Sequence, residues 1–440
     1  MFNNIKITNN KLYSSLLLSF FPISFILGNL AINLNIILII LFSLFIFKIE
    51  REDNKINLVF FDKLIIFFFV YIFFVTLLNY IKLPQSDQSN QLIIKSFSYL
   101  RYLIFYFSIR YLIKKNYFDL KLFFFSCSVC VIFVSLDIIF QYNFGRDIFN
   151  FKAVPRRMSG PFGDELIAGG YLSRFSLIFI FLFCVFGDLN KIHILKKITF
   201  YLTTFLILSF GLILAGNRVP LLIFFTMLFL CFFLVKNYKT YFFSFFIIAA
   251  FSLVSLMNYD TNIRKHYGGF QTKIINFLQP FSDDKKIEYK DLKNLTNTER
   301  EYTFSYKGDV FIAPTVHTKE FYTGIKTWSK NKFLGGGLKS FRFNCPKVFI
   351  NCNAHPHNYY LEILSDLGLV GFFLIISLLI YIFYKSYLSK KIIIVPFSII
   401  LFGETFPLKT MGSFFSTSNS TFIFLLFSLI IGILNRKDLK

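Results

Sequence analysis

Long apolar runs alternate with short polar segments along most of the chain. A run of about 17–25 apolar residues can cross a bilayer as a helix, in which each backbone group finds its partner within the segment. The pattern predicts an all-α polytopic membrane protein with about twelve transmembrane helices. The predicted spans are 14–32, 34–48, 64–80, 96–113, 119–140, 169–187, 198–216, 219–235, 241–258, 368–385, 392–408 and 419–434.

Lys and Arg residues in the short loops predict the orientation of these spans. Lys114 and Lys115 follow the fourth span, Lys236 and Lys239 follow the eighth, and Arg436 follows the last. Short loops rich in Lys and Arg face the cytoplasm. Both termini are therefore expected in the cytoplasm.

Composition changes this picture only by excluding other classes. The chain is 55% hydrophobic and 16% charged, whereas soluble domains have about 25% charged residues. A net charge of +23 is typical of nucleic-acid binding, but the apolar content is too high for a soluble protein of that class. We expect membrane lipid as a partner and no nucleic acid.

Two segments on the side opposite the lysine-rich loops are long, 141–168 and 259–367, and the second lies between the ninth and tenth spans. Functional residues concentrate in such segments, because short loops merely connect. The chain therefore divides into helices one to nine (1–258), an outer segment (259–367) and helices ten to twelve (368–440).

The outer segment contains Cys345 and Cys352, with six residues between them. In an oxidising compartment a disulfide is favoured over two free thiols. The segment also holds four of the five histidines, namely His266, His317, His355 and His357. Four histidines can bind a metal, but no close acidic pairing such as H-E-x-x-H accompanies them, so no metal site is predicted.

The stretch from His355 to Gly371 carries the most specific signal. His357, Gly368 and Gly371 fall on one face of a predicted helix, with leucines between them at intervals of three to four residues. Small residues allow close helix contact in a membrane. This helix would hold His357 at the outer membrane boundary, where a neutral imidazole can act as a general base.

A His-Asn pair, nine residues and then Gly-x-x-Gly resembles the signature of the bacterial O-antigen ligase and O-antigen polymerase superfamily. The matching residues are His357, Asn358, Gly368 and Gly371. Three more segments are similar to family motifs: the glycine-rich segment 335–341, the segment 157–162 (Arg-Met-Ser-Gly-Pro-Phe) and the pair Asn217-Arg218. The resemblance runs from about residue 137 to the end of the chain.

This resemblance implies transfer of a glycan from undecaprenyl diphosphate to a hydroxyl acceptor at the periplasmic face of the bacterial inner membrane, without a cofactor. His357 would take the proton of the acceptor hydroxyl, and Arg157 and Arg218 would hold the diphosphate. Attack would invert the anomeric carbon, and arginines would take the place of a metal. Lipid A–core is the expected acceptor, which makes the protein an O-antigen ligase.

Alternatives remain within and outside the family. An O-antigen polymerase uses a second lipid-linked glycan as acceptor, and a protein O-oligosaccharyltransferase shares the same residues. A polysaccharide transporter or flippase would also have twelve spans, but it would show charged or broken helices at mid-membrane.

Further residues are predicted to bind substrate, and some have structural alternatives. Glu165 would pair with Arg157 or Arg174 or contact sugar hydroxyls, and Arg218 would otherwise form a structural ion pair. Many relatives carry an Arg where this chain has His317 or Lys319. The predicted substrate-binding residues are Arg174, Arg342, Glu165, His317, His355 and Asn358.

Overall fold

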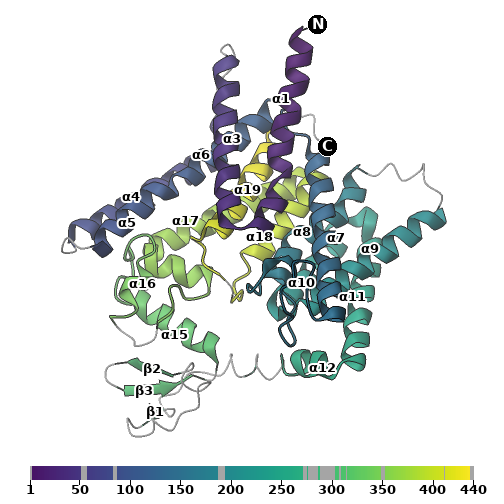
Figure 1. The fold of residues 1–440 in the computed structure, drawn as a ribbon. Helices are drawn as coiled ribbons and strands as arrows, with labels where there is room; N and C mark the ends of the chain where they lie inside the picture. The colour runs from purple at the N-terminus through teal and green to yellow at the C-terminus, as the bar shows by residue number, and fades with distance from the viewer. Residues whose placement is uncertain are drawn as a thin grey trace.

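The computed structural model describes residues 2–50, 57–82, 87–186, 194–270, 275, 286–287, 303–306, 309–313, 315–347, 352–410 and 412–436. It is mostly helical (Figure 1). The α-helices are α1 (Phe2–Ser19), α2 (Phe21–Leu27), α3 (Asn29–Ile49), α4 (Phe60–Lys82), α5 (Asp87–Tyr99), α6 (Arg101–Lys114), α7 (Leu120–Phe144), α8 (Ala168–Phe186), α9 (Ile194–Leu214), α10 (Arg218–Leu234), α11 (Lys239–Tyr259), α12 (Thr261–Gly268), α15 (Val316–Trp328), α16 (Phe341–Asn344), α17 (Tyr359–Ser389), α18 (Val395–Glu404) and α19 (Thr417–Leu434). Three short 3-10 helices are η1 (Gly160–Phe162), η3 (Lys236–Tyr238) and η6 (Ile392–Ile394).

Within the described residues, nine helical segments are long and apolar enough to cross a membrane. Three shorter apolar segments, Leu202–Leu214, Arg218–Leu234 and Ile392–Glu404, lie where the seventh, eighth and eleventh spans are predicted. The chain is therefore a multi-pass membrane protein, and a total of twelve crossings stays a prediction. The nine are Asn9–Leu27, Asn29–Ile49, Phe60–Lys82, Asn90–Lys114, Leu120–Phe144, Ala168–Phe186, Lys236–Tyr259, Tyr359–Ser389 and Thr417–Leu434.

The boundary between the first two spans differs from the prediction. The first span ends at Leu27 instead of residue 32, because Gly28 has φ 96° and separates α2 from α3. Glycine adopts this backbone conformation readily, whereas a side chain would make it costly.

Helix α19 is the centre of the bundle. In this span 83% of the residues are buried inside the protein, the highest share among the nine candidates. It packs against α3, α6, α17 and α18. Figure 1 shows α19 in yellow among these helices.

One of the two arginines in the fourth predicted span, Arg110, is paired inside the bundle. Arg110 on α6 forms a buried ion pair with Asp62 on α4, and the Tyr106 hydroxyl donates to the same carboxylate at 2.7 Å. A charge among membrane helices is costly unless it is paired. The pair therefore accounts for Arg110 in an apolar helix.

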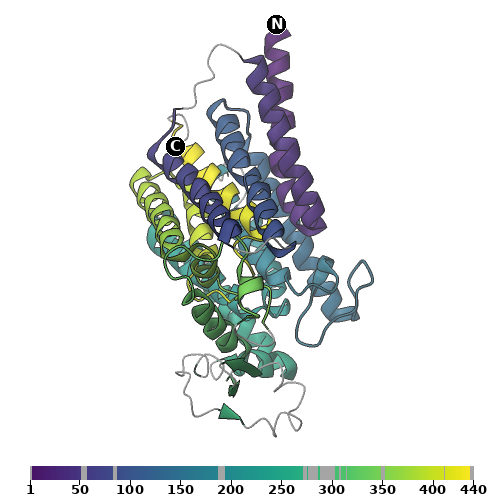
Figure 2. The same ribbon diagram turned by 90° about the vertical axis from the view of Figure 1, so that its left-hand side faces the viewer.

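The structure adds a small antiparallel sheet that the all-α prediction did not include. Its strands are β1 (Lys286–Ile287), β2 (Thr303–Tyr306) and β3 (Asp309–Ile312), in the order β1-β3-β2. Strands of two to four residues are too short for a clear alternating pattern. The sheet lies at the end of the bundle opposite the start of α1 and the end of α19, and Figure 2 shows this separation from the side.

Candidate functional site

The predicted site begins with a break in α17. Gly368 has φ 66° and ψ −168°, although the helix continues on both sides of it. The predicted continuous helical face from His357 to Gly371 is therefore wrong, because α17 begins at Tyr359 and is interrupted at Gly368. Helix α17 also begins nine residues before the predicted start of the tenth span at 368.

The glycine-rich segment packs against this break, backbone to backbone. A Cβ atom on Gly368 would lie 2.2 Å from the Phe333 carbonyl oxygen, and one on Gly335 would lie 2.5 Å from the Asp366 carbonyl oxygen. A Cβ on Gly371 would meet the Leu367 side chain, also at 2.2 Å. Gly335 and Gly368 therefore let segment 333–337 lie directly on α17.

Hydrogen bonds from α17 and α4 fix the segment that follows. The buried Asp366 carboxylate accepts from the backbone N–H of Lys339 and of Phe341, both at 2.8 Å, and from the Ser340 hydroxyl at 3.0 Å. On α4, the Thr76 hydroxyl accepts from the Leu338 N–H at 3.0 Å. The start of α16 is therefore placed relative to α17.

Asn358 caps the N-terminus of α17. Its side-chain oxygen accepts from the backbone N–H groups of Tyr360 and Leu361 at 3.0 and 3.1 Å. Its side-chain nitrogen donates to the carbonyl oxygens of Pro407 at 2.7 Å and Lys409 at 3.3 Å. Asn358 was predicted to bind substrate. In the structure it is buried, and both ends of its side-chain amide form hydrogen bonds within the protein.

His357 directly precedes this cap, in a backbone conformation with φ 50°. Its ring centroid is 4.3 Å from that of His355. Burial lowers the pKa of His357. Burial, His357, Arg342 and Lys339 together lower the pKa of His355 to about 4. Both imidazoles therefore favour the neutral form at neutral pH.

Two cations lie near this histidine pair, and two more lie near those cations. Lys339 and Arg342 act electrostatically on His355, and they also act on Lys95 of α5. Burial, Arg342 and Arg101 lower the pKa of Lys339, while nearby carboxylates oppose this shift. We call Lys95, Arg101, Lys339 and Arg342 the histidine-side cluster. Only Arg342 was predicted from the sequence.

A second group of cations lies at the start of α10. The Arg218 Nη2 atom is 3.4 Å from Nδ1 of His266 on α12, and His266 Nε2 is 2.8 Å from the Gly216 carbonyl oxygen. Arg156 and Arg157 act electrostatically on Arg218. We call Arg156, Arg157 and Arg218 the arginine cluster.

The arginine cluster is held by close packing and by side chain to backbone bonds. A Cβ on Gly216 would lie 2.2 Å from the Arg156 carbonyl oxygen. Asn217 donates to the Leu166 carbonyl oxygen and accepts from the Gly169 N–H, both at 3.0 Å. Asn217 thus links the starts of α8 and α10.

A comparison with protein families finds a match for the part of the chain that contains His355 and His357. Residues 203–376 match the protein-family model described as O-antigen ligase. This segment is similar to the O-antigen ligase family. No curated protein matches the chain. The matched O-antigen ligase segment contains Arg218, the histidine pair and the glycine break, whereas Arg157 and Arg174 precede it.

Arg174, before the O-antigen ligase segment, belongs to a buried ionic network. Its Nε and Nη2 atoms donate to the two carboxylate oxygens of Glu404 at 2.8 and 2.9 Å, and Lys409 donates to the same carboxylate at 2.9 Å. The alternative in which Glu165 pairs with Arg174 is therefore wrong. Glu165 is exposed, and among the described residues neither Arg157 nor Arg218 forms an ion pair.

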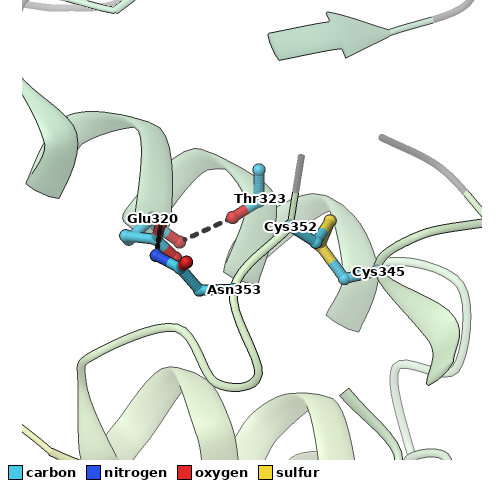
Figure 3. Close-up of a disulfide and its surroundings, with 5 residues drawn as sticks. All are labelled: Glu320, Thr323, Cys345, Cys352 and Asn353. Atoms are coloured by element: carbon cyan, nitrogen blue, oxygen red, sulfur yellow. Dashed lines mark hydrogen bonds between the residues drawn. A yellow bond between two sulfur atoms is a disulfide. The ribbon is translucent and has the colours of Figure 1, made fainter. Parts of the chain in front are cut away.

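Within the O-antigen ligase segment, Cys345 and Cys352 form a disulfide (Figure 3). The neighbouring Asn353 donates to the carboxylate of Glu320 on α15 at 2.5 Å. Glu320 is 1% exposed, and this burial raises its pKa to about 7. His317, also on α15, is exposed.

Helix α15 lies over the start of α17. A Cβ on Gly324 would lie 3.2 Å from the side chains of Pro356 and Leu361. Helix α15 therefore packs against residues that precede and follow His357 in the chain. Glu320, one turn earlier, was not predicted to be functional. A single Glu among polar residues gives no sequence signal of burial.

Proposed function

We propose that the protein transfers an O-antigen or similar glycan from undecaprenyl diphosphate to a hydroxyl of lipid A–core at the periplasmic face of the inner membrane. The observation that carries this proposal is the position of His357. It lies in the O-antigen ligase segment, half-buried, with a lowered pKa and beside a cluster of cations.

The proposed chemistry begins with a neutral imidazole. Burial lowers the pKa of His357, so its ring holds a free lone pair at neutral pH. This nitrogen takes the proton of the acceptor hydroxyl, and the acceptor oxygen attacks the anomeric carbon of the first sugar. The bond from that carbon to the diphosphate oxygen breaks, its electron pair leaves with the diphosphate, and the anomeric centre inverts. A positioned general base accelerates such a step by about 10²–10⁴-fold.

The arginine cluster is the proposed site for the leaving diphosphate. Arg157 and Arg218 act on one another as like charges, and an anion between them would offset that repulsion. Their guanidinium groups offer paired donors that match phosphate oxygens. They would supply the positive charge that a divalent cation otherwise provides in phosphate transfer.

The other predicted residues divide between structural and substrate roles. Asn358 and Arg174 are assigned to positioning, because their polar groups bond within the protein. His355 and Arg342 stay proposed substrate contacts beside His357. Glu165 and His317 are exposed and stay predictions.

The proposed orientation has both termini in the cytoplasm. Two features support it: the loop lysines gather on one side of the predicted spans, and α1 begins and α19 ends opposite the small sheet (Figure 1). The histidine pair would then face the periplasm.

The lipopolysaccharide profile of a deletion strain tests the proposal. We expect loss of all O-antigen from lipid A–core, with long glycan chains still attached to the carrier lipid. Lipid A–core capped with a single repeat unit would instead identify an O-antigen polymerase. A normal profile would refute both activities.

A further inference from the structure

The histidine-side cluster has more positive charge than its surroundings neutralise. Its four cations come from α5, α6, the glycine-rich segment and α16. Within the described part of the chain, the ion pairs are Arg110–Asp62, Lys115–Glu50, Arg174–Glu404 and Lys409–Glu404, and none includes these four. Like charges held together lower stability unless an anion joins them.

The nearest carboxylates are already engaged. Asp366 accepts hydrogen bonds from the backbone N–H groups of Lys339 and Phe341. Glu362 accepts from the Ser413 hydroxyl and from the Phe414 N–H, both at 2.6 Å. Both carboxylates act on the side-chain ammonium group of Lys339 only through space. They therefore reduce the positive potential of the cluster without pairing with its cations.

Polar atoms in the cluster and on the adjacent His355 ring also lack partners. Nε of Arg101, Nε of Arg342 and Nε2 of His355 are buried and form no hydrogen bond within the described residues. Buried polar groups in folded proteins are normally hydrogen-bonded, so each exception needs an explanation, such as an ordered water or a bound group. These three atoms, two in the cluster and one on the adjacent His355 ring, favour a site for a ligand with several polar oxygens.

This cluster is separate from the arginine cluster. The cations that act on His355 are Lys339 and Arg342, whereas those that act on Arg218 are Arg156 and Arg157. Helices α16 and α10, which carry one member of each cluster, lie apart in Figure 1. Two cationic sites can hold two different anionic groups.

We propose that the histidine-side cluster binds a phosphate or carboxylate group of the acceptor, and so places the acceptor hydroxyl at His357. The inference rests on the proposed function, in which the donor's one diphosphate occupies the arginine cluster. The second anion must then come from the molecule that brings the hydroxyl. The cluster is on the acceptor side because two of its cations, Lys339 and Arg342, act on His355, whose ring lies 4.3 Å from that of the proposed base His357.

Binding to the full-length protein in phosphatidylcholine nanodiscs tests this assignment. Radiolabelled glucose 6-phosphate is the acceptor probe, glucose is its uncharged control, and farnesyl diphosphate is the donor probe. The wild type should bind glucose 6-phosphate at least about tenfold more tightly than glucose, because a charge-assisted hydrogen bond contributes that much or more.

The variant Lys339→Gln/Arg342→Gln should weaken glucose 6-phosphate binding roughly tenfold or more, with farnesyl diphosphate binding changed less than about twofold. Arg157→Gln/Arg218→Gln should do the reverse. Lys332→Gln, in the same loop with an exposed side chain, should change neither. All variants are compared only if they elute as single monodisperse species.

Each outcome separates the two claims. Equal binding of glucose and glucose 6-phosphate, or unchanged glucose 6-phosphate binding in Lys339→Gln/Arg342→Gln, overturns the acceptor site. Weaker farnesyl diphosphate binding in that variant assigns the cluster to the donor and also overturns it. Unchanged farnesyl diphosphate binding in Arg157→Gln/Arg218→Gln refutes the donor part of the proposed function, while the glucose 6-phosphate result remains readable.

Discussion

The substitution Gly368→Ala should detach the glycine-rich segment from α17. A residue with φ 66° and ψ −168° is strained by about 1–3 kcal/mol when it carries a side chain. The new Cβ would also lie 2.2 Å from the Phe333 carbonyl oxygen and 2.7 Å from the Gly335 nitrogen. Both neighbours are backbone atoms, so relief requires the whole segment to move.

Moving the segment breaks hydrogen bonds that hold it on α17. Gly336 N–H donates to the Ser365 carbonyl oxygen at 3.0 Å, and Gly337 N–H donates to the Asp366 carbonyl oxygen at 2.8 Å. Each such bond contributes about 0.5–1.5 kcal/mol. With the strain, the segment should lose about 2–6 kcal/mol of local stability, which raises its open fraction by roughly 30-fold or more.

Hydrogen exchange of purified protein measures this loss directly. In Gly368→Ala, peptides covering Gly336 and Gly337 should exchange faster, and glycan transfer should fall because Lys339 and Arg342 are displaced. Gly170→Ala is the matched control, since no heavy atom lies within 4 Å of the added Cβ in α8. Unchanged exchange and transfer in Gly368→Ala would refute the packing argument.

Three further perturbations test the surroundings of the site. Burial raises the pKa of Glu320 to about 7, above its ordinary 4.5. The folding stability of the wild type should therefore fall by up to about 3 kcal/mol as pH rises from 4.5 to 7. Glu320→Gln should remove this pH dependence when melting is measured across the same range. Cys345→Ser/Cys352→Ser should lower unfolding free energy by about 2–3 kcal/mol, whereas a melting temperature equal to that of the wild type would contradict a structural disulfide. Arg174→Ala leaves Glu404 buried with one partner fewer and should cost about 3–5 kcal/mol in the same assay, while a purely functional role predicts wild-type melting.

The apolar pattern predicts the helices well because a membrane demands long uninterrupted runs. It fails at Gly28 and Gly368, where the helix breaks. A glycine within an apolar run is equally compatible with a continuous helix, and contacts from elsewhere in the chain decide its φ. For Gly368 the deciding contact is Phe333, 35 residues earlier.

The candidate site is predictable where its chemistry is local. His357 and Arg218 stand in short motifs, and a sequence is enough to find them. Arg174 was predicted to bind substrate. Its actual partner, Glu404, is 230 residues away, so the sequence gives no sign of the ion pair. Asn358 could have been identified as a helix cap, since Asn directly before the helical pattern is a preferred N-cap residue.

Three of the four members of the histidine-side cluster were missed for a related reason. Lys95, Arg101 and Lys339 lie in three different segments, and only the packing of α5, α6 and the glycine-rich segment brings their charges together. Lys339 alone had a sequence signal, because it lies within the glycine-rich motif.

Single-turnover glycan transfer by His357→Ala tests the central claim most directly. We expect a fall of about 10²–10⁴-fold in the transfer rate, with monodisperse protein and farnesyl diphosphate binding close to wild type. As pH falls from 8 to 6.5, the wild-type rate should drop less than it would for a base with the ordinary histidine pKa of 6.5, since burial lowers the pKa of His357. A transfer rate in His357→Ala within a few fold of the wild type would contradict a base role for this histidine.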